Sequence, residues 1–170
     1  VIANLSLVVI SIYTGIAQGV QPIISNRYGL KDFASIRAIL RYAMITTMIF
    51  SVFIYANVFF GASPITTIFN SEQNALLQSI ATEGLRLYFI ACPFAGFNIT
   101  ISMYFTSTEC PRPAHAISIL RGFLVIIPMA FLLSWIGKIH GVWCAFPVTE
   151  FLVAAFGLFL YIARVKKSDI

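Results

Sequence analysis

The sequence predicts an all-α membrane protein, a polytopic bundle with five transmembrane helices. Long apolar segments fill almost the whole 170-residue chain, and the Lys and Arg residues lie in alternate gaps between them. The composition agrees, because 59% of the residues are hydrophobic and only 10% are charged, unlike ordinary soluble domains. The lipid bilayer is therefore expected to be the solvent for most of this chain.

The first two predicted spans cover residues 1–26 and 36–60, and each exceeds the roughly 20 residues needed to cross the hydrocarbon core. A basic stretch joins them. Within it, Gly29 permits a turn and Asp32 is placed to cap the following helix. This segment predicts an elbow at the membrane surface.

A polar, Pro-containing link at residues 61–74 leads into a third helix at 75–107, which is long enough to tilt or to project from the membrane. The fourth span is predicted at 116–136 and the fifth at 142–163, with a tight link at Gly137 to Gly141 between them. A tail at 164–170 follows.

The basic residues predict the orientation of the bundle. Nine lie on one side of the membrane and two, Arg86 and Lys138, on the other, which places the C-terminus in the cytoplasm. The nine are Arg27, Lys31, Arg37, Arg41, Arg112, Arg121, Arg164, Lys166 and Lys167. Five crossings then put the N-terminus outside, so we expect a preceding helix and an even number of spans in a longer parent protein.

The net charge of +5 does not indicate nucleic-acid binding, because basic residues confined to span ends are explained by anionic lipid headgroups. Enzymatic motifs are lacking, and His115 and His140 are predicted at opposite membrane faces. The three cysteines have no metal-ligand spacing. We therefore predict neither an enzyme nor a metal site, and no cofactor.

Polar residues recur along the first span at spacings of seven, three and four, which places them on one helix face. In lipid this stripe must turn inward, either to bond to neighbouring helices or to line an aqueous cavity. Gln18 and Gln21, one turn apart, are candidates for a substrate or cation pathway. The stripe comprises Asn4, Ser11, Thr14, Gln18, Gln21 and Ser25.

Glu150 lies eight residues into the fifth span, or roughly 12 Å along its axis, close to the membrane midplane. A carboxylate there costs about 2.5 to 3.5 kcal/mol on insertion scales, so it is expected to face the protein interior. A cation or proton site and a structural carboxylate bonded to a neighbouring helix both explain it. Its helix face is predicted to include Trp143, Pro147, Ala154, Gly157 and Tyr161.

Prolines and polar residues interrupt three spans. Pro93 and Gly96 in the third, Pro128 in the fourth and Pro147 in the fifth are candidates for kinks or gating. Asn98 and Ser102 follow Pro93 and, like Glu150, are candidates for the pathway. Tyr104 joins them as an aromatic ring suited to cation–π contact.

Several strings resemble the multidrug and toxic compound extrusion (MATE) transporters across nearly the whole chain. The main ones are the run Gly15 to Gly29, Gly84 to Tyr88, Pro93 to Asn98, Leu120 to Gly122, and Gly141 to Trp143 leading to Glu150. The resemblance implies helices eight to twelve of a twelve-helix antiporter, most of its six-helix C-terminal lobe.

The family resemblance further implies multidrug efflux from the plasma membrane, in bacteria the inner membrane. Amphipathic, often cationic compounds would leave in exchange for inward Na⁺ or H⁺, by alternating access of two lobes. The expected partners are membrane lipid, these substrates and the missing N-terminal lobe. Some members carry an acidic residue midway along the tenth helix, whereas the matching region here, Phe97 and Asn98, has none.

Two alternatives remain. A lipid-linked oligosaccharide or polysaccharide flippase has related architecture but needs a more cationic cavity, and Arg86 and Arg121 are predicted too near the span ends for that. A non-transporting membrane scaffold subunit would use its polar stripes only to bind neighbouring helices.

Overall fold

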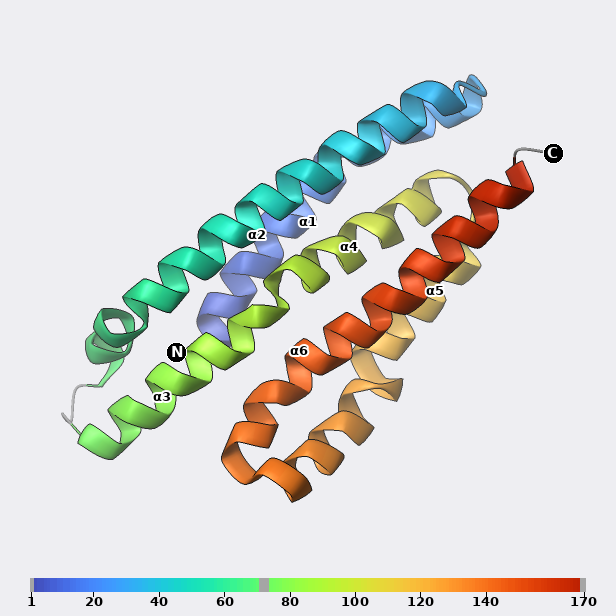
Figure 1. Cartoon of the computed structure of the whole chain (residues 1–170). Coiled ribbons are helices and arrows are strands. Elements are labelled where there is room, and N and C mark those ends of the chain that lie inside the picture. Colours follow the sequence, from blue (N-terminus) through green and yellow to red (C-terminus); the bar gives the residue numbers. More distant parts are fainter. Residues whose placement is uncertain (1, 71–73, 169–170) are drawn as a thin grey trace.

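The computed structural model describes residues 2–70 and 74–168, with the side chains of residues 69 and 166–168 outside the description. Helices account for all elements of the described part, and they lie side by side along one direction (Figure 1). In chain order they are α1 (Ile2–Gly29), α2 (Phe33–Phe69), α3 (Ala75–Tyr88), the 3₁₀ turn η1 (Phe89–Ala91), α4 (Cys92–Ser107), α5 (Pro111–Ile119), the π-helix η2 (Leu120–Leu124) and α6 (Ile126–Ser168).

Four helical stretches of the described chain are long and apolar enough to cross a membrane: Ile2–Gly29, Phe33–Ile68, Ala75–Ser107 and Pro111–Val165. The predicted fourth and fifth spans both fall within the last of these. It is interrupted at Lys138, whose backbone is not helical (φ 49, ψ −126), and the chain reverses direction in this region (Figure 1). The reversal coincides with the predicted link at Gly137 to Gly141.

In the elbow between α1 and α2, the start of α2 is capped by Asp32 as predicted. The Asp32 side chain accepts a hydrogen bond from the Ser35 backbone N–H at 3.1 Å, which confirms the predicted cap. Gly29 is not the residue that makes the turn, however. Lys31 adopts the left-handed conformation (φ 57), while Gly29 still belongs to α1.

The predicted loop at residues 61–74 is wrong over 61–69, because α2 continues to Phe69. Pro64 is accommodated inside the helix, and the Thr66 hydroxyl donates to the backbone of Ala62. The Gln78 amide of α3 also donates to Thr66 Oγ1 at 2.7 Å. These bonds satisfy the Thr66 hydroxyl and the Gln78 amide, so the polar residues that predict a loop are accommodated in a helix.

Three parts of the predicted elements lie outside the described residues. They are Val1 of the first span, residues 71–73 of the link, and residues 169–170 of the tail.

The predicted single helix at 75–107 is also interrupted, since η1 separates α3 from α4. Pro93 lacks the backbone N–H that would bond to Phe89 in a continuous α-helix. The N–H of Cys92 bonds to the Phe89 carbonyl instead, in the tighter 3₁₀ pattern. The break therefore satisfies the carbonyl that the proline leaves free.

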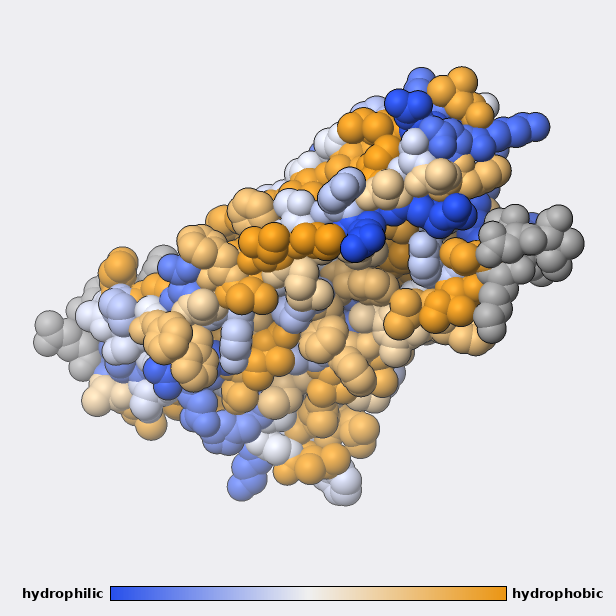
Figure 2. Space-filling model, turned by 45° about the horizontal axis from the view of Figure 1, so that its top comes forward, coloured by the Kyte–Doolittle hydropathy of each residue, from blue (hydrophilic) through white to orange (hydrophobic). Residues whose placement is uncertain are grey.

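Helix α4 is central to the bundle and packs against α1, α2, α5 and α6. A side chain at Gly96 would collide with Thr47 of α2 and touch Tyr13 of α1, so this glycine permits the close approach of three helices. Large apolar side chains remain exposed around the outside, as expected for a lipid-facing surface. Figure 2 shows hydrophilic residues gathered mainly towards the ends of the molecule, with a largely hydrophobic band between them.

Candidate functional site

Glu150 faces the interior of the bundle, as its position in the sequence predicts. Its side chain is 0% exposed, and Pro147 and Gly157 on the same helix face are buried too, whereas Phe151 and Phe159 on the opposite face are exposed. Glu150 lies twelve residues beyond the reversal at Lys138, which corresponds to about 18 Å of helix. That rise is a little over half the thickness of a hydrocarbon core of about 30 Å.

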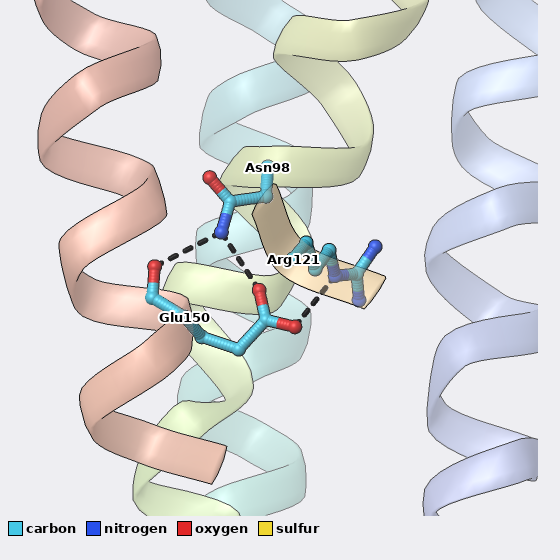
Figure 3. Close-up of polar contacts among 3 residues, drawn as sticks. All are labelled: Asn98, Arg121 and Glu150. Carbon is cyan, nitrogen blue, oxygen red and sulfur yellow. Dashed lines mark hydrogen bonds and ion pairs between the residues drawn. The ribbon is translucent and has the colours of Figure 1, made fainter. Parts of the chain in front are cut away.

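Two side chains hold the Glu150 carboxylate (Figure 3). The Arg121 Nε donates to Oε1 at 2.5 Å, and the Asn98 Nδ2 donates to Oε2 at 2.7 Å. The same Asn98 nitrogen lies 2.9 Å from the Glu150 backbone oxygen. Asn98 is fully buried, and its Oδ1 has no hydrogen-bond partner among the described residues. The carboxylate is thus paired with a cation and bonded to a neutral amide from α4.

The π-helix η2 carries Arg121 to this position. The N–H of Val125 bonds to the carbonyl of Leu120 at 2.9 Å, one residue wider than in an α-helix. Such single π turns occur frequently at functional sites because they change the direction of a side chain without ending the helix. Here the turn lies immediately before Ile126, where α6 begins.

Sequence analysis missed the role of Arg121, which it assigned to the cytoplasmic end of the fourth span as an orientation signal. The Arg121 side chain is only 22% exposed and forms an ion pair with Glu150. A signal was present: Arg121 lies five residues inside the predicted span of 116–136, between apolar neighbours. A buried cation in such a segment calls for an acidic partner.

A cavity of about 560 Å³ lies beside the cluster, between α1, α4, the α5–η2 segment and α6. Its polar lining includes Ser102, Ser118, Arg121 and Glu150, and Phe146 adds an aromatic ring. The lining contains one Arg and one Glu, so its formal charge is zero. Glu150 borders the cavity but is fully buried, and the partly exposed Arg121 is the charged group accessible from it.

The structure brings together three of the six predicted pathway residues: Asn98, Ser102 and Glu150. Gln18 is exposed and Gln21 half-buried on a part of α1 that the other described helices do not cover. Tyr104 lies in a second cavity, nearer the C-terminal end of α4, under the guanidinium of Arg164.

The four kink candidates have different surroundings. Pro93 follows η1 at the start of α4, and Gly96 lies at the close contact of α4 with α1 and α2. Pro128 is in the first turn of α6, directly after the π-helix, whereas Pro147 is inside α6 and buried. Residues 2–70 and 74–168 contain no group of three or more His, Cys, Asp or Glu side chains able to hold a metal ion.

Among curated proteins, the chain is 22% identical over 154 residues to a protein from Shewanella oneidensis named "FAD transporter". It is also 22% identical over 131 residues to "Uncharacterized protein MG447 homolog" from Mycoplasma pneumoniae. These matches cover 88% and 77% of this chain but only 33% and 23% of the two relatives. The chain therefore spans about a third or less of their lengths.

Two solved structures share its fold, both described as a multidrug resistance MATE family transporter of the MOP superfamily. The outward-facing conformation matches with a TM-score of 0.89 at 15% identity, and the inward-facing one with 0.88 at 16%. Each match covers 98% of this chain, and 37% and 39% of the respective solved chains.

A family model also matches a large part of the chain. The MatE model matches residues 1–132, well over half of the chain. This confirms the resemblance found in the sequence, and with it a multi-pass membrane protein of a transporter class and not an enzyme. The chain belongs to the MatE family of membrane transporters.

Proposed function

We propose that this chain is most of the C-terminal lobe of a secondary active exporter. The complete protein would move amphipathic compounds out of the cell in exchange for inward Na⁺ or H⁺. The observation that carries the proposal is the Glu150 carboxylate, fully buried in the bundle and bonded to Arg121 and Asn98 beside a cavity. A buried ionisable group of this kind is characteristic of ion-coupled transport sites.

The proposed topology has five crossings. The reversal at Lys138 divides the stretch Pro111–Val165 into two arms, each long enough to span the hydrocarbon core. The elbow between α1 and α2, which carries Arg27, Lys31 and Arg37, lies at the same end of the bundle as the last turns of α6 (Figure 1). This excess of positive charge favours a cytoplasmic location for that end. The membrane would be the plasma membrane, in bacteria the inner one.

The missing partner of this chain would be an N-terminal lobe. Asn4, Ser11, Gln18 and Ser25 are exposed on α1 at intervals of seven residues, and a Cβ added at Gly15 or Gly19 would meet nothing within 4 Å. A lipid-facing position would be costly for such a polar stripe. We infer that it faces the second lobe across the substrate path, as the inverted or repeated halves of other transporters do.

Coupling would act through the charge balance of Glu150 and Arg121. A proton on Glu150 would remove the negative charge and leave the guanidinium of Arg121 uncompensated in a region of low dielectric. Displacement of Arg121 towards water would then be favoured. This movement would shift the equilibrium between two conformations of the lobe. For Na⁺, the Glu150 carboxylate and the unpartnered Asn98 Oδ1 offer the oxygen ligands that hard cations prefer.

The substrate class follows from the cavity. Apolar walls with few polar groups and no net formal charge suit amphipathic compounds of varied shape, including the aromatic cations expected from the sequence. A second class, amphipathic anions, is favoured by the exposed part of Arg121 and by the name of the Shewanella relative, since FAD carries phosphate groups and aromatic rings. A flippase for lipid-linked sugars would need excess positive charge, which Glu150 cancels here.

The test is Glu150→Gln in the full-length protein, reconstituted into vesicles with an imposed Na⁺ or H⁺ gradient. We expect ion-driven transport of a fluorescent cationic dye, or of a flavin nucleotide, to fall by about tenfold or more while folding is retained. Glu83→Gln is the matched control, because Glu83 is 58% exposed and pairs only with His140 in the described structure.

Unchanged flux in Glu150→Gln would make this carboxylate structural. Absence of any ion-driven flux in the wild type would favour a scaffold, and movement of labelled lipid-linked sugar would favour a flippase.

A further inference from the structure

A second polar cavity, of about 220 Å³, lies at the end of the bundle where α1 turns into α2. Residues far apart in the sequence meet there: Tyr28 and Arg37 from the elbow, Tyr104 and Thr108 from the end of α4, and Arg164 from the last turns of α6. Ile36 and Phe33 add apolar surface. None of these side chains lines the cavity beside Glu150.

Arg164 is held in this cavity by two contacts, yet it retains unused hydrogen-bonding capacity. Its Nη2 donates to the Thr108 carbonyl at 2.9 Å, and its Cζ lies 5.7 Å from the centre of the Tyr104 ring. Its Nη1 is buried and has no hydrogen-bond partner among the described residues. A buried guanidinium nitrogen without an acceptor is costly, so a ligand that supplies one would be stabilised.

The lining has two arginines, Arg37 and Arg164, and no carboxylate. Asp32, the acid of the adjacent turn, is engaged elsewhere, with Arg27 at 3.5 Å and with the Ser35 backbone. The formal charge of the lining is therefore +2. Two cations sharing one recess repel each other, and an anion between them removes that repulsion.

We propose that this cavity binds a phosphate group. The planar guanidinium offers paired N–H donors that match two phosphate oxygens, and the hydroxyls of Tyr28 and Tyr104 add neutral donors. Phe33 and Ile36 would contact the carbon atoms attached to the phosphate. The position, at the ends of apolar helices, is the depth at which phospholipid phosphates lie.

A bound phosphate would link the elbow after α1 to the ends of α4 and α6. Its occupancy would therefore affect the stability of this end of the lobe.

The experiment uses the full-length protein purified in a zwitterionic detergent, with native mass spectrometry to count bound molecules and thermal unfolding to measure stabilisation. The probes are phosphatidylglycerol, phosphatidylcholine and inorganic phosphate. The variants are Arg164→Gln, Arg164→Lys and Arg37→Gln, and the control is Arg41→Gln, which removes an exposed charge one turn along α2 from Arg37 and outside the cavity.

We expect phosphatidylglycerol to bind the wild type and Arg41→Gln equally and Arg164→Gln at least about tenfold more weakly, the loss of one charge-assisted hydrogen bond. Arg37→Gln should weaken binding as well, and Arg164→Lys should bind more tightly than Arg164→Gln.

Inorganic phosphate that binds with the same dependence on Arg164 would support the site and identify its ligand as free phosphate. Equal loss in Arg41→Gln, or binding by phosphatidylcholine and phosphatidylglycerol alike, would overturn the proposal. Should Arg164→Gln not fold, undiminished binding by Arg37→Gln would also overturn it.

Discussion

The Nε of Arg121 lies 2.5 Å from Oε1 of Glu150, although the two residues are 29 positions apart and the chain reverses between them. The pair joins the two arms of Pro111–Val165, with the Glu150 side chain fully buried and the Arg121 side chain mostly so. Asn98 contributes from a third helix, so the cluster connects α4, η2 and α6. Each charged residue is tolerated at this depth because the other neutralises it.

Loss of one partner should therefore destabilise the protein more than loss of both. We expect Glu150→Leu or Arg121→Met alone to lower the free energy of unfolding of the full-length protein by about 3 to 5 kcal/mol, because an unpaired buried charge remains. The double variant should lose less than either single variant. Denaturant unfolding in detergent measures this cycle, and strict additivity would show that the two side chains are not coupled.

Asn98→Leu should cost about 1 to 3 kcal/mol, since the Glu150 carboxylate loses one of its two donors in a buried site. Thr106→Val is the comparison on the same helix, because Thr106 is exposed and bonds only to its own helix backbone. It should change stability by less than about 0.5 kcal/mol. Equal effects of the two variants would mean that the Asn98 amide contributes little.

Gly84→Ala tests the packing of α3 against α6. A Cβ at residue 84 would lie 2.6 and 2.9 Å from two ring carbons of Trp143, closer than real Cβ atoms come to their neighbours, and 3.0 Å from a third. We expect a loss of about 1 to 3 kcal/mol in unfolding experiments. Gly61→Ala, whose new Cβ meets only the Ile65 side chain at 3.5 Å, should be tolerated. Trp143→Leu in the Gly84→Ala background should recover part of the loss, and no recovery would refute the steric explanation.

The Asp32 cap predicts a dependence on pH at the start of α2. The hydrogen bonds from Ser35, and then the charge of Arg27, lower the pKa of Asp32 below its ordinary value of 3.8. Because the pKa is lowered, the ionised cap stabilises the start of the helix at pH values above 3.8. This stabilisation is lost as the pH falls through the pKa of Asp32 in the folded protein.

Hydrogen exchange at the Ser35 amide measures this effect. At neutral pH, wild type should be better protected than Asp32→Ala, and the difference should shrink below pH 3.8. Asp32→Asn, which caps without a charge, should show no such pH dependence. A wild-type advantage that persists unchanged into strong acid would argue against the ionised cap.

Local chemistry predicted much of the fold. The start of α3 at Ala75 agrees with the predicted 75, and the Asp32 cap is where the sequence places it. The errors lie where tertiary contacts compensate for unfavourable local residues. The end of α2 contains Ser63, Pro64 and Thr66, a composition typical of loops, yet bonds from Gln78 of α3 stabilise it as helix.

The sequence by itself determined the all-α membrane class, the family resemblance and the inward orientation of Glu150, because hydropathy and helical periodicity depend only on residue type and position. Only the tertiary structure decided which partner that carboxylate has. Arg121 and Asn98 reach it through a π turn, a chain reversal and the packing of α4 against α6, and such long-range geometry leaves no periodic signal in a single chain. It likewise placed Arg37 and Arg164, which are 127 positions apart in the sequence, in the lining of one cavity.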